Sequence, residues 1–239
     1  MPSAQFIVAM ILGCVIVPQL ANVATTVYLH RALTHRAITL KKPATWFFRI
    51  IIWLTTGIIP KTWAAVHRKH HRFTDQVGDP HSPIVLGFWK VQLFNVWYYA
   101  RESKHIDTNR WAKDVPEYGW LDRHSLSGFL VGFFTLYLIC GWWGVAAGGI
   151  HMVIYIGLNS LVNGLCHVRG YKTYPEADAY NVRWVAFFAS GEGLHNNHHK
   201  YPANPKLRTG HKWFEFDLGW LCIKFLQFIG QVEYKKPSA

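Results

Sequence analysis

The stretch FIVAMILGCVIVPQLANVATTVYL (Phe6–Leu29) contains no charged residue and is followed directly by HRALTH (His30–His35). A second charge-free stretch, residues 125–166, is long enough for two further helices. A membrane-spanning helix needs about 20 predominantly apolar residues, and soluble cores rarely contain uncharged apolar runs of this length. The alternative, core helices of a soluble protein, is therefore disfavoured. The sequence predicts an all-α integral membrane protein with about three transmembrane helices.

The expected spans are separated by recognisable signals. They lie at about residues 6–29, 126–147 and 149–166. We expect the flexible pair Gly148-Gly149 to form the turn between the last two spans. Nothing in length or composition indicates a second domain, so residues 1–239 are expected to form a single membrane domain.

The distribution of charge predicts the orientation. The chain carries a formal charge of +12, and all of its Lys and Arg lie in residues 31–123 and 169–236. A basic balance can indicate nucleic-acid binding, but basic residues also collect on the cytosolic side of a membrane. We therefore expect residues 30–123 and 167–239 to be cytosolic and Met1 to lie outside. Membrane lipid is an expected partner, and nucleic acid is not.

Two further apolar segments, residues 44–59 and 213–230, are predicted to be interfacial helices. If residues 44–59 crossed the bilayer, the histidines before and after this segment would lie on opposite faces and would not share a site. The segment is also short for a span and contains Arg49. We therefore expect it to lie at the cytosolic interface or to fold back, with Trp and Arg side chains at headgroup depth.

The strongest chemical signal is a set of histidines in four groups that follow hydrophobic segments. The nine residues are His30, His35, His67, His70, His71, His167, His195, His198 and His199. Two of the groups have the spacing HxxHH, which places three imidazoles on one face of an α-helix. A solvated basic surface would not collect every group at the cytosolic end of a hydrophobic element. The remaining histidines, which we expect to be ordinary core or surface residues, are His81, His105, His124, His151 and His211.

Nine imidazoles indicate two metal ions. A single metal with an open position needs only three or four protein ligands. Imidazole suits iron, zinc and copper, whereas the small number of carboxylates disfavours magnesium and calcium. The spacing does not assign individual histidines to either metal.

These motifs resemble the three histidine boxes of the membrane acyl desaturases, in particular the stearoyl-CoA desaturases and bacterial Δ9 acyl desaturases. The matching segments are HRALTHR, HRKHHRFTD followed by DPHSP, and GEGLHNNHH. The family's NxxxH element is matched by Asn163 and His167. The resemblance implies that the nine histidines bind two iron ions (Fe²⁺/Fe³⁺) directly and that Asn163 approaches a metal through a water molecule. It also implies O2 as co-substrate and a cis double bond, at Δ9, as the product.

Two departures from the family pattern affect these expectations. Family members commonly have a hydrophobic span before the helix that leads into the first box, whereas this chain begins at that helix, so three spans are expected. Val66 precedes His67 where the stearoyl-CoA desaturases have an acidic residue. The candidates for carboxylates that orient the histidines are Asp75, Asp79 and Glu192.

The resemblance also implies the partners. The substrate is expected to be an acyl chain carried as acyl-CoA, acyl-ACP or acyl lipid, in a channel lined in part by residues 88–100 and 184–191. The four cysteines have no spacing for an iron–sulfur cluster, so electrons must come from a separate donor of the ferredoxin or cytochrome b5 type. The protein is expected in the bacterial inner membrane or the endoplasmic reticulum, with its active site facing the cytosol.

Several alternatives share part of this signal. A histidine-box hydroxylase, acetylenase or alkane monooxygenase would use the same metal chemistry, although the spacing favours desaturation. A divalent-metal transporter is a more distant alternative, because transporters tend to place their ligands near the bilayer midplane on broken helices.

Overall fold

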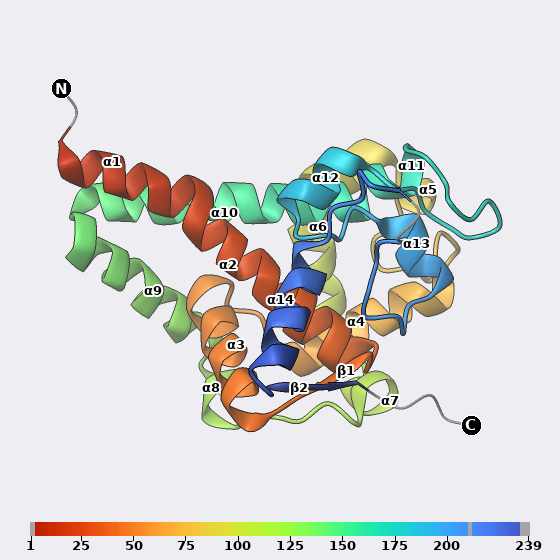
Figure 1. The fold of residues 1–239 in the computed structure, drawn as a ribbon, viewed down its shortest axis with the longest axis horizontal. Helices are drawn as coiled ribbons and strands as arrows, with labels where there is room; N and C mark the ends of the chain where they lie inside the picture. The colour runs from red at the N-terminus through yellow and green to blue at the C-terminus, as the bar shows by residue number, and fades with distance from the viewer. Residues whose placement is uncertain (1–2, 210–211, 235–239) are drawn as a thin grey trace.

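The computed structural model describes residues 3–209 and 212–234. The regular secondary structure of these residues is helical except for one pair of short antiparallel strands. The elements in chain order (Figure 1) are α1 (Ala4–Ile11), η1 (Leu12–Ile16), α2 (Val17–Ala24), η2 (Thr25–Thr34), β1 (Ile38–Leu40), α3 (Lys42–Thr55), α4 (Pro60–Phe73), α5 (Pro83–Leu86), α6 (Phe88–Ser103), α7 (Thr108–Ala112), α8 (Trp120–Arg123), α9 (Ser125–Cys140), α10 (Trp142–Asn163), α11 (Leu165–Val168), α12 (Arg183–Phe188), α13 (His195–Lys200), α14 (Leu218–Phe228) and β2 (Val232–Tyr234). The predicted all-α class is confirmed. Two predictions, that Met1 lies on the outer side of the membrane and that His211 is an ordinary core or surface residue, concern residues outside the described ranges.

The first helix is longer than a membrane span. Elements α1 to η2 form one continuous rod of 31 residues, Ala4–Thr34. At 1.5 Å per residue the rod is about 46 Å long, whereas the hydrocarbon core of a bilayer is about 30 Å thick. The rod is therefore long enough to carry its last turns, including His30, beyond the apolar layer.

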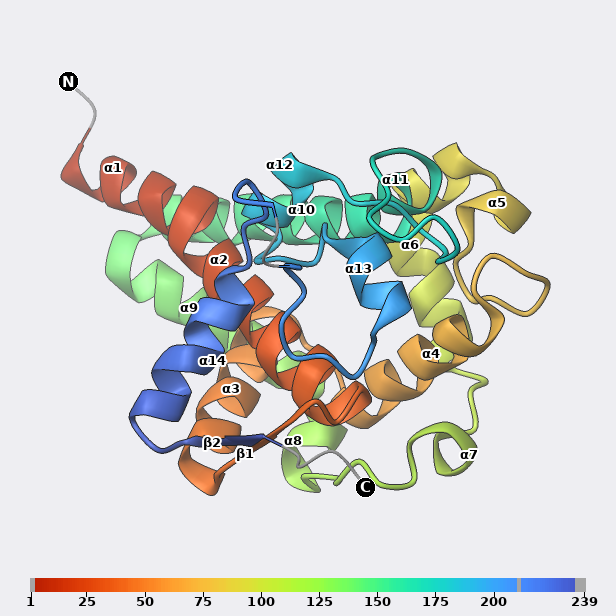
Figure 2. The same ribbon diagram turned by 45° about the vertical axis from the view of Figure 1, so that its right-hand side comes forward.

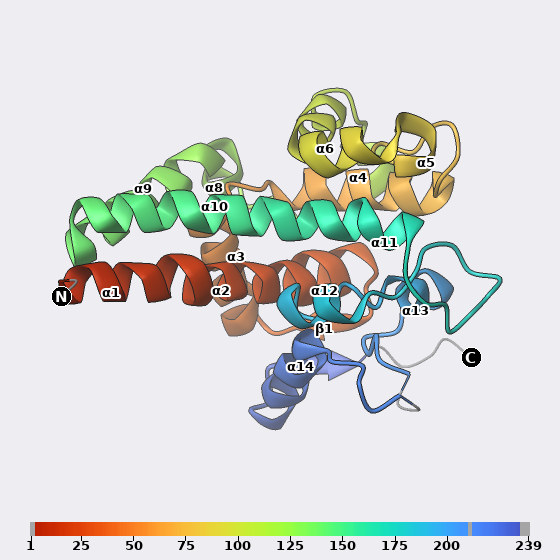
Figure 3. The same cartoon turned by 90° about the horizontal axis from the view of Figure 1, so that it is seen from above.

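A second rod, α10 with α11, covers Trp142–Val168 and lies beside the first (Figure 3). The two helices approach closely at Gly13, where an added Cβ would lie only 2.6 Å from the backbone oxygen of Ala147. The absence of a side chain at this position lets the helices pack with their backbones in near contact. Both rods run toward the same end of the molecule, where the histidines lie.

The turn before this second rod differs from the prediction. The chain reverses at Gly141, which has a φ of 59°, and α10 continues without a break through Gly148 and Gly149. The expected division into residues 126–147 and 149–166 is therefore wrong. Gly148 serves close helix packing instead, because a Cβ there would lie 2.7 Å from the Phe133 ring of α9.

Residues 44–59, which were predicted to form an interfacial helix, lie in α3 and in the turn that follows it. Helices α3 and α4 meet at a bend of 88°. Trp53 of α3 lies against Gly128, which is near the start of α9. Helix α3 therefore crosses the first turns of α9. The bend keeps the histidines of α4 next to those at the end of η2, as the predicted fold-back requires.

The predicted helix at residues 213–230 is observed as the shorter α14. Its first residue is set by Asp217, whose carboxylate accepts a hydrogen bond from the backbone nitrogen of Trp220 and caps the helix. The chain then forms β2, which pairs with β1 in the register Ile38↔Tyr234. This pairing holds β2, near the C-terminal end of the described residues, beside β1, which follows the first histidine box.

Candidate metal centre

The first histidine pair lies on a π-helix. In η2 the backbone nitrogen of His35 donates to the carbonyl oxygen of His30 at 3.0 Å, a contact between residues five apart. In an α-helix, residues five apart would point about 140° away from each other. The π-helical turn instead brings the two imidazoles together, with ring centroids 4.8 Å apart. The spacing HxxxxH is the sequence signal for this local geometry.

The other two boxes lie on α-helices, as predicted. Helix α4 carries His67, His70 and His71, and α13 carries the third box. In each HxxHH motif the first and last histidines are one turn apart and face the same way. The Nε2 atoms of His67 and His71 are 3.0 Å apart, and those of His195 and His199 are 3.2 Å apart. The middle histidine of each motif points toward a different set of neighbours.

The nine predicted histidines come together as two clusters, in each of which the candidate ligand atoms lie within 4.8 Å of one another. The five-histidine cluster consists of His30, His35, His67, His71 and His198. The four-histidine cluster consists of His70, His167, His195 and His199. Each HxxHH motif thus gives its outer pair to one cluster and its middle histidine to the other. The clusters adjoin, because the rings of His71 and His199 stack with centroids 4.6 Å apart.

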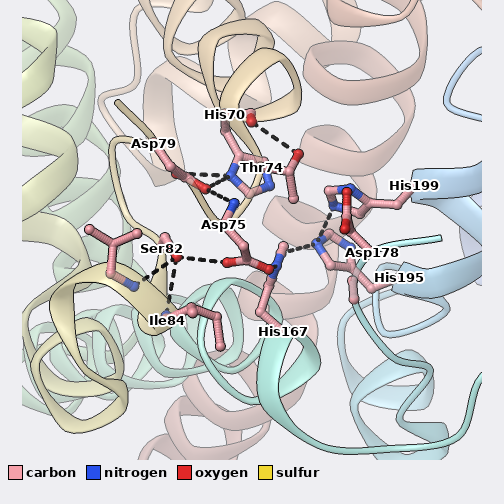
Figure 4. Close-up of polar contacts among 12 residues, drawn as sticks. His70, Thr74, Asp75, Asp79, Ser82, Ile84, His167, Asp178, His195 and His199 are labelled. Carbon is pink, nitrogen blue, oxygen red and sulfur yellow. Dashed lines mark hydrogen bonds and ion pairs between the residues drawn. The ribbon is translucent and has the colours of Figure 1, made fainter. Parts of the chain in front are cut away.

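Three carboxylates orient histidines in these clusters. The Nδ1 atom of His30 lies 2.8 Å from Glu192, and that of His70 lies 2.9 Å from Asp79. The third pair, His167 with Asp75, is also 2.9 Å apart, and Figure 4 shows Asp75 between His167 and Ser82. A histidine whose Nδ1–H donates to a carboxylate presents the lone pair of Nε2 to a metal. The prediction that Asp75, Asp79 and Glu192 have this role is confirmed at the level of contact.

The two acidic groups on the loop after α4 are held in the charged form. Burial raises the pKa of Asp79, but the hydrogen bonds that its carboxylate accepts from His70 and from the backbone nitrogen of His81 contribute to a larger lowering, so the net shift is downward. Burial also raises the pKa of Asp75, but the interactions with His167 and the hydrogen bond from Ser82 together lower it by more. Both carboxylates are therefore ionised acceptors at neutral pH.

His67 is supported without a carboxylate. Val66, which replaces the expected acidic residue, is buried. The imidazole of His67 stacks on the indole of Trp63 with an interplanar angle of 7° and a centroid distance of 4.9 Å. The flat contact with Trp63 fixes the ring plane of His67, as the hydrogen bond to a carboxylate does at His30, His70 and His167.

The chemistry of the donor set fits metal ions. The Nε2 atoms of His167 and His195 face each other at 3.0 Å, although the Nδ1 of His167 already carries the proton that Asp75 accepts. Within the described residues, the buried Nε2 atoms of His35 and His70 have no hydrogen-bond partner. Buried imidazole nitrogens are normally paired. Converging lone pairs on neutral imidazoles are what iron, zinc or copper ligation requires.

Comparison with known proteins agrees with this geometry. The family model for fatty acid desaturase matches residues 5–217. Delta-9 acyl-lipid desaturase 1 of Arabidopsis thaliana is 34% identical over 93% of this chain and 74% of its own length. Acyl-CoA C20 Delta5-desaturase of Anemone leveillei is 34% identical (90% and 70%), and sn-1 stearoyl-lipid 9-desaturase of Anabaena variabilis is 33% identical (86% and 75%).

The chain belongs to the fatty acid desaturase family. It is an oxidoreductase that acts as a fatty acyl desaturase. Family membership favours desaturation over hydroxylation and disfavours the metal-transporter alternative. The clusters also lie at the ends of the long helices, not at their midpoints.

Asn163, the last residue of α10, lies beside the desaturase clusters and belongs to neither of them. Its Nδ2 atom donates to Oδ1 of Asn95 at 3.1 Å. The side chain borders the same cavity as His195. This position agrees with an approach through water, which stays a prediction.

His81 was predicted to lie apart from the site, but the structure places it alongside. Its ring stacks on His70 with centroids 4.7 Å apart, and its backbone nitrogen donates to Asp79. Burial, with the neighbouring His70, lowers the pKa of His81 to about 3, so the ring is neutral at physiological pH. Its sequence position two residues after Asp79 was the signal for this location. His105 and His124 are exposed, and His151 donates to the backbone oxygen of Thr55, away from the clusters.

A cavity of about 370 Å³ adjoins the clusters of this desaturase. It is bordered by His30, His67 and His195 at one end and continues along α10 to Met152. From Asn163 to Met152 the helix rises about 16 Å. Of the two segments expected to line a channel, residues 88–100 contribute Asn95, Val96 and Tyr99, and residues 184–191 contribute Ala189.

Proposed function

We propose that the protein is a di-iron, O2-dependent desaturase that introduces a cis double bond, at Δ9, into a saturated fatty acyl chain. The observation that carries this proposal is the division of nine histidines, all buried or half-buried, into two adjoining clusters at the end of an elongated cavity. Two adjacent sites are what a two-metal oxygen chemistry requires.

The five-histidine cluster would hold one iron ion and the four-histidine cluster the other. The smaller cluster leaves room for a water molecule bound by Asn163, the residue at the cavity wall. When bound, the iron pair supplies the oxidising power that removes two hydrogens from unactivated methylenes, which no amino-acid side chain provides.

The chain's own residues position the substrate. One end of the cavity is bordered by metal-cluster histidines and by Trp63 and Val66, so a methylene pair there lies beside the clusters. Farther in, the wall is closed by a hydrogen bond of 2.7 Å between Thr25 and Tyr155. Burial of the side chains around the clusters keeps bulk water from the reacting carbons.

The acyl carrier and the electron donor are proposed on chemical grounds. The relatives include both an acyl-lipid and an acyl-CoA desaturase. We therefore propose an acyl thioester or acyl lipid as the substrate. The four cysteines lie on four different elements, so electrons would come from a separate ferredoxin-type or cytochrome b5-type protein. The basic composition of residues 30–123 and 167–239 suits an acidic donor.

We propose that the clusters face the cytosol, in the bacterial inner membrane or the endoplasmic reticulum. The two long rods and α9 would form three spans. The lysines and arginines would then lie on the side where the positive-inside rule expects them.

The experiment that tests the function is expression in a host whose lipids are all saturated. We expect monounsaturated fatty acids from the wild-type protein, none from His70→Ala, and undiminished product from His105→Ala, an exposed histidine outside both clusters. Mass spectrometry of total fatty acids gives the answer. Product from His70→Ala would contradict the metal-site assignment, and a hydroxylated product would select a hydroxylase instead.

A further inference from the structure

An exposed apolar face covers α5 and the N-terminal two thirds of α6. Trp89 and Leu93 are 70% and 66% exposed. The residues that form this face, called here the α6 apolar face, are Ile84, Val85, Trp89, Leu93, Phe94, Val96 and Trp97. The opposite side of the same helix is buried at Val91 and Asn95. A contiguous aromatic surface of this kind is a contact site when it belongs to a folded protein.

Helix α6 crosses the second rod at a defined depth. Asn95 of α6 accepts a hydrogen bond from Asn163, and Gln92 lies against Gly164. From Trp142 to Asn163, α10 has 22 residues, which corresponds to about 33 Å. Because the hydrocarbon core is about 30 Å thick, the crossing lies where this span leaves the apolar layer. Figure 2 shows α6 running across α10 at this end.

The exposed charges on α6 are positive and would attract an anionic surface. Lys90, Arg101 and Lys104 are exposed, at or next to the apolar face. The guanidinium of Arg101 lies over the Trp97 ring, 5.6 Å from its centroid. The one acidic residue of α6, Glu102, is paired at 2.6 Å with Lys69 of α4. Aromatic side chains with flanking cations are typical of helices that lie in a membrane interface.

We propose that the α6 apolar face is seated in the lipid interface on the side of the metal centre, with anionic headgroups at Lys90, Arg101 and Lys104. This seating requires that the two long rods span the membrane and is independent of the reaction. The occupant is the bilayer because α6 crosses α10 at the depth where that helix meets the headgroups, and because cations lie beside the exposed aromatic residues. Sequence periodicity did not indicate this interfacial helix.

The proposal gives α6 a second role in the site. Asn95, Tyr99 and Ser103 on its inner side border the cavity, and Val96 is both exposed and at the cavity wall. The helix is bent at Phe94, whose backbone is not helical. Helix α6 is then the wall between the cavity and the lipid.

A spin label at Leu93 tests the seating in the full-length protein. The background carries Cys14→Ala and Cys222→Ala, while the buried Cys140 and Cys166 remain. The protein is reconstituted into vesicles of phosphatidylcholine and phosphatidylglycerol. Collision of the label with oxygen, which concentrates in lipid, is compared with collision with a water-soluble nickel chelate.

Two labelled controls bracket the result. Leu138→Cys lies on the exposed side of α9, and Val77→Cys lies in the loop between α4 and α5, where Val77 is 87% exposed. We expect the oxygen-to-nickel ratio at Leu93→Cys to be several-fold higher than at Val77→Cys and to approach that at Leu138→Cys. A ratio equal to that at Val77→Cys would overturn the proposal. Protection from both reagents with spin–spin broadening would also overturn it, because a second copy of the chain would then cover the face.

An independent measurement needs no substitution. Wild-type protein in vesicles whose lipids carry a photoreactive group near the headgroup should be labelled on residues 88–103 and not on residues 75–79. The reverse pattern, or label on neither segment, contradicts the seating of α6.

Discussion

His70 and Asp79 form the most deeply buried of the three histidine–carboxylate pairs, with Nδ1 and Oδ2 2.9 Å apart and side chains that are 1% and 0% exposed. The same carboxylate accepts hydrogen bonds from the backbone nitrogens of Asp75 and His81. Asp79 therefore ties the loop that follows α4 to the histidine that α4 gives to the four-histidine cluster. The orientation of His70 depends on a residue outside both histidine clusters.

Asp79→Asn is expected to weaken the four-histidine site. The amide has no charge to hold the Nδ1–H of His70, so Nε2 loses both orientation and basicity. Loss of such a partner typically lowers metal affinity or activity by about 10–100-fold. Metal retained per chain during dialysis against increasing chelator measures the effect. Glu117→Gln, whose carboxylate is 65% exposed and pairs with Lys61, is the control and should retain metal like the wild type.

Because the clusters have different numbers of histidines, we expect the loss of one histidine to weaken metal retention more in the smaller cluster. His71→Ala leaves four histidines in its cluster, whereas His199→Ala leaves three. We expect His199→Ala to lose one metal ion at a lower chelator concentration than His71→Ala does. Metal analysis across a chelator series distinguishes the two variants. Identical loss curves would indicate that the clusters act as one undivided site.

A bulky side chain in the cavity should stop the reaction without removing metal. Ile156 on α10 borders the cavity, and Val153 on the same helix is 73% exposed on its other side. We expect Ile156→Trp to reduce unsaturated product at least tenfold with unchanged metal content, because the indole fills space that the acyl chain needs. Val153→Trp is the matched control and should leave product unchanged. Full activity of Ile156→Trp would show that this cavity does not hold the substrate.

The ion pair between Arg68 and Asp114 predicts a pH-dependent contribution to stability. Arg68 of α4 donates to both oxygens of Asp114, at 2.6 and 2.9 Å, and to the carbonyl oxygens of Leu33 and Thr34 at the end of η2. It thus joins the helices of the first two histidine boxes. The hydrogen bond from Arg68 lowers the pKa of Asp114 below its unfolded value of 3.8.

Because this pKa is depressed in the folded protein, the stabilisation is complete above pH 3.8 and is lost as the pH falls through the folded value. Asp114 is 33% exposed, and screening limits the effect to about 1 kcal/mol. Metal-free Asp114→Asn should therefore unfold at a lower temperature than the wild type at pH 7, and the difference should vanish in strong acid. Glu176→Gln, which removes an exposed ion pair to Lys200, should show little difference at either pH. A difference for Asp114→Asn that grew as the pH fell would contradict the assignment.

Much of the site follows from sequence because the chemistry needs particular residue types. The nine histidines and the carboxylates Asp75, Asp79 and Glu192 are identifiable as a set. Their division into clusters is not, because it depends on which neighbour each ring faces once the four elements η2, α4, α11 and α13 have packed. His30 and His35 show a second limit, since HxxxxH makes one face only when the backbone forms a π-helix.

In the fold, too, the sequence predicts features that depend on local composition but not those that depend on how the helices pack. Charge-free stretches predict the long helices, but the pair Gly148-Gly149, which has the composition of a turn, lies inside α10, and Gly148 serves there as a packing surface for Phe133. The turn forms at Gly141, which adopts a positive φ. The aromatic residues of α6 do not by themselves distinguish a channel lining from an interfacial contact, because that distinction depends on where the helix crosses α10.

The measurement that tests the central claim most directly is the metal content of the purified wild-type protein, counted as iron plus any zinc that replaces it. Two adjoining histidine clusters predict about two metal ions per chain in the wild type and about one in His199→Ala after mild chelation. A wild-type protein that binds only one metal ion per chain when metal is supplied in excess would contradict the two-site assignment and the proposed di-iron desaturation with it.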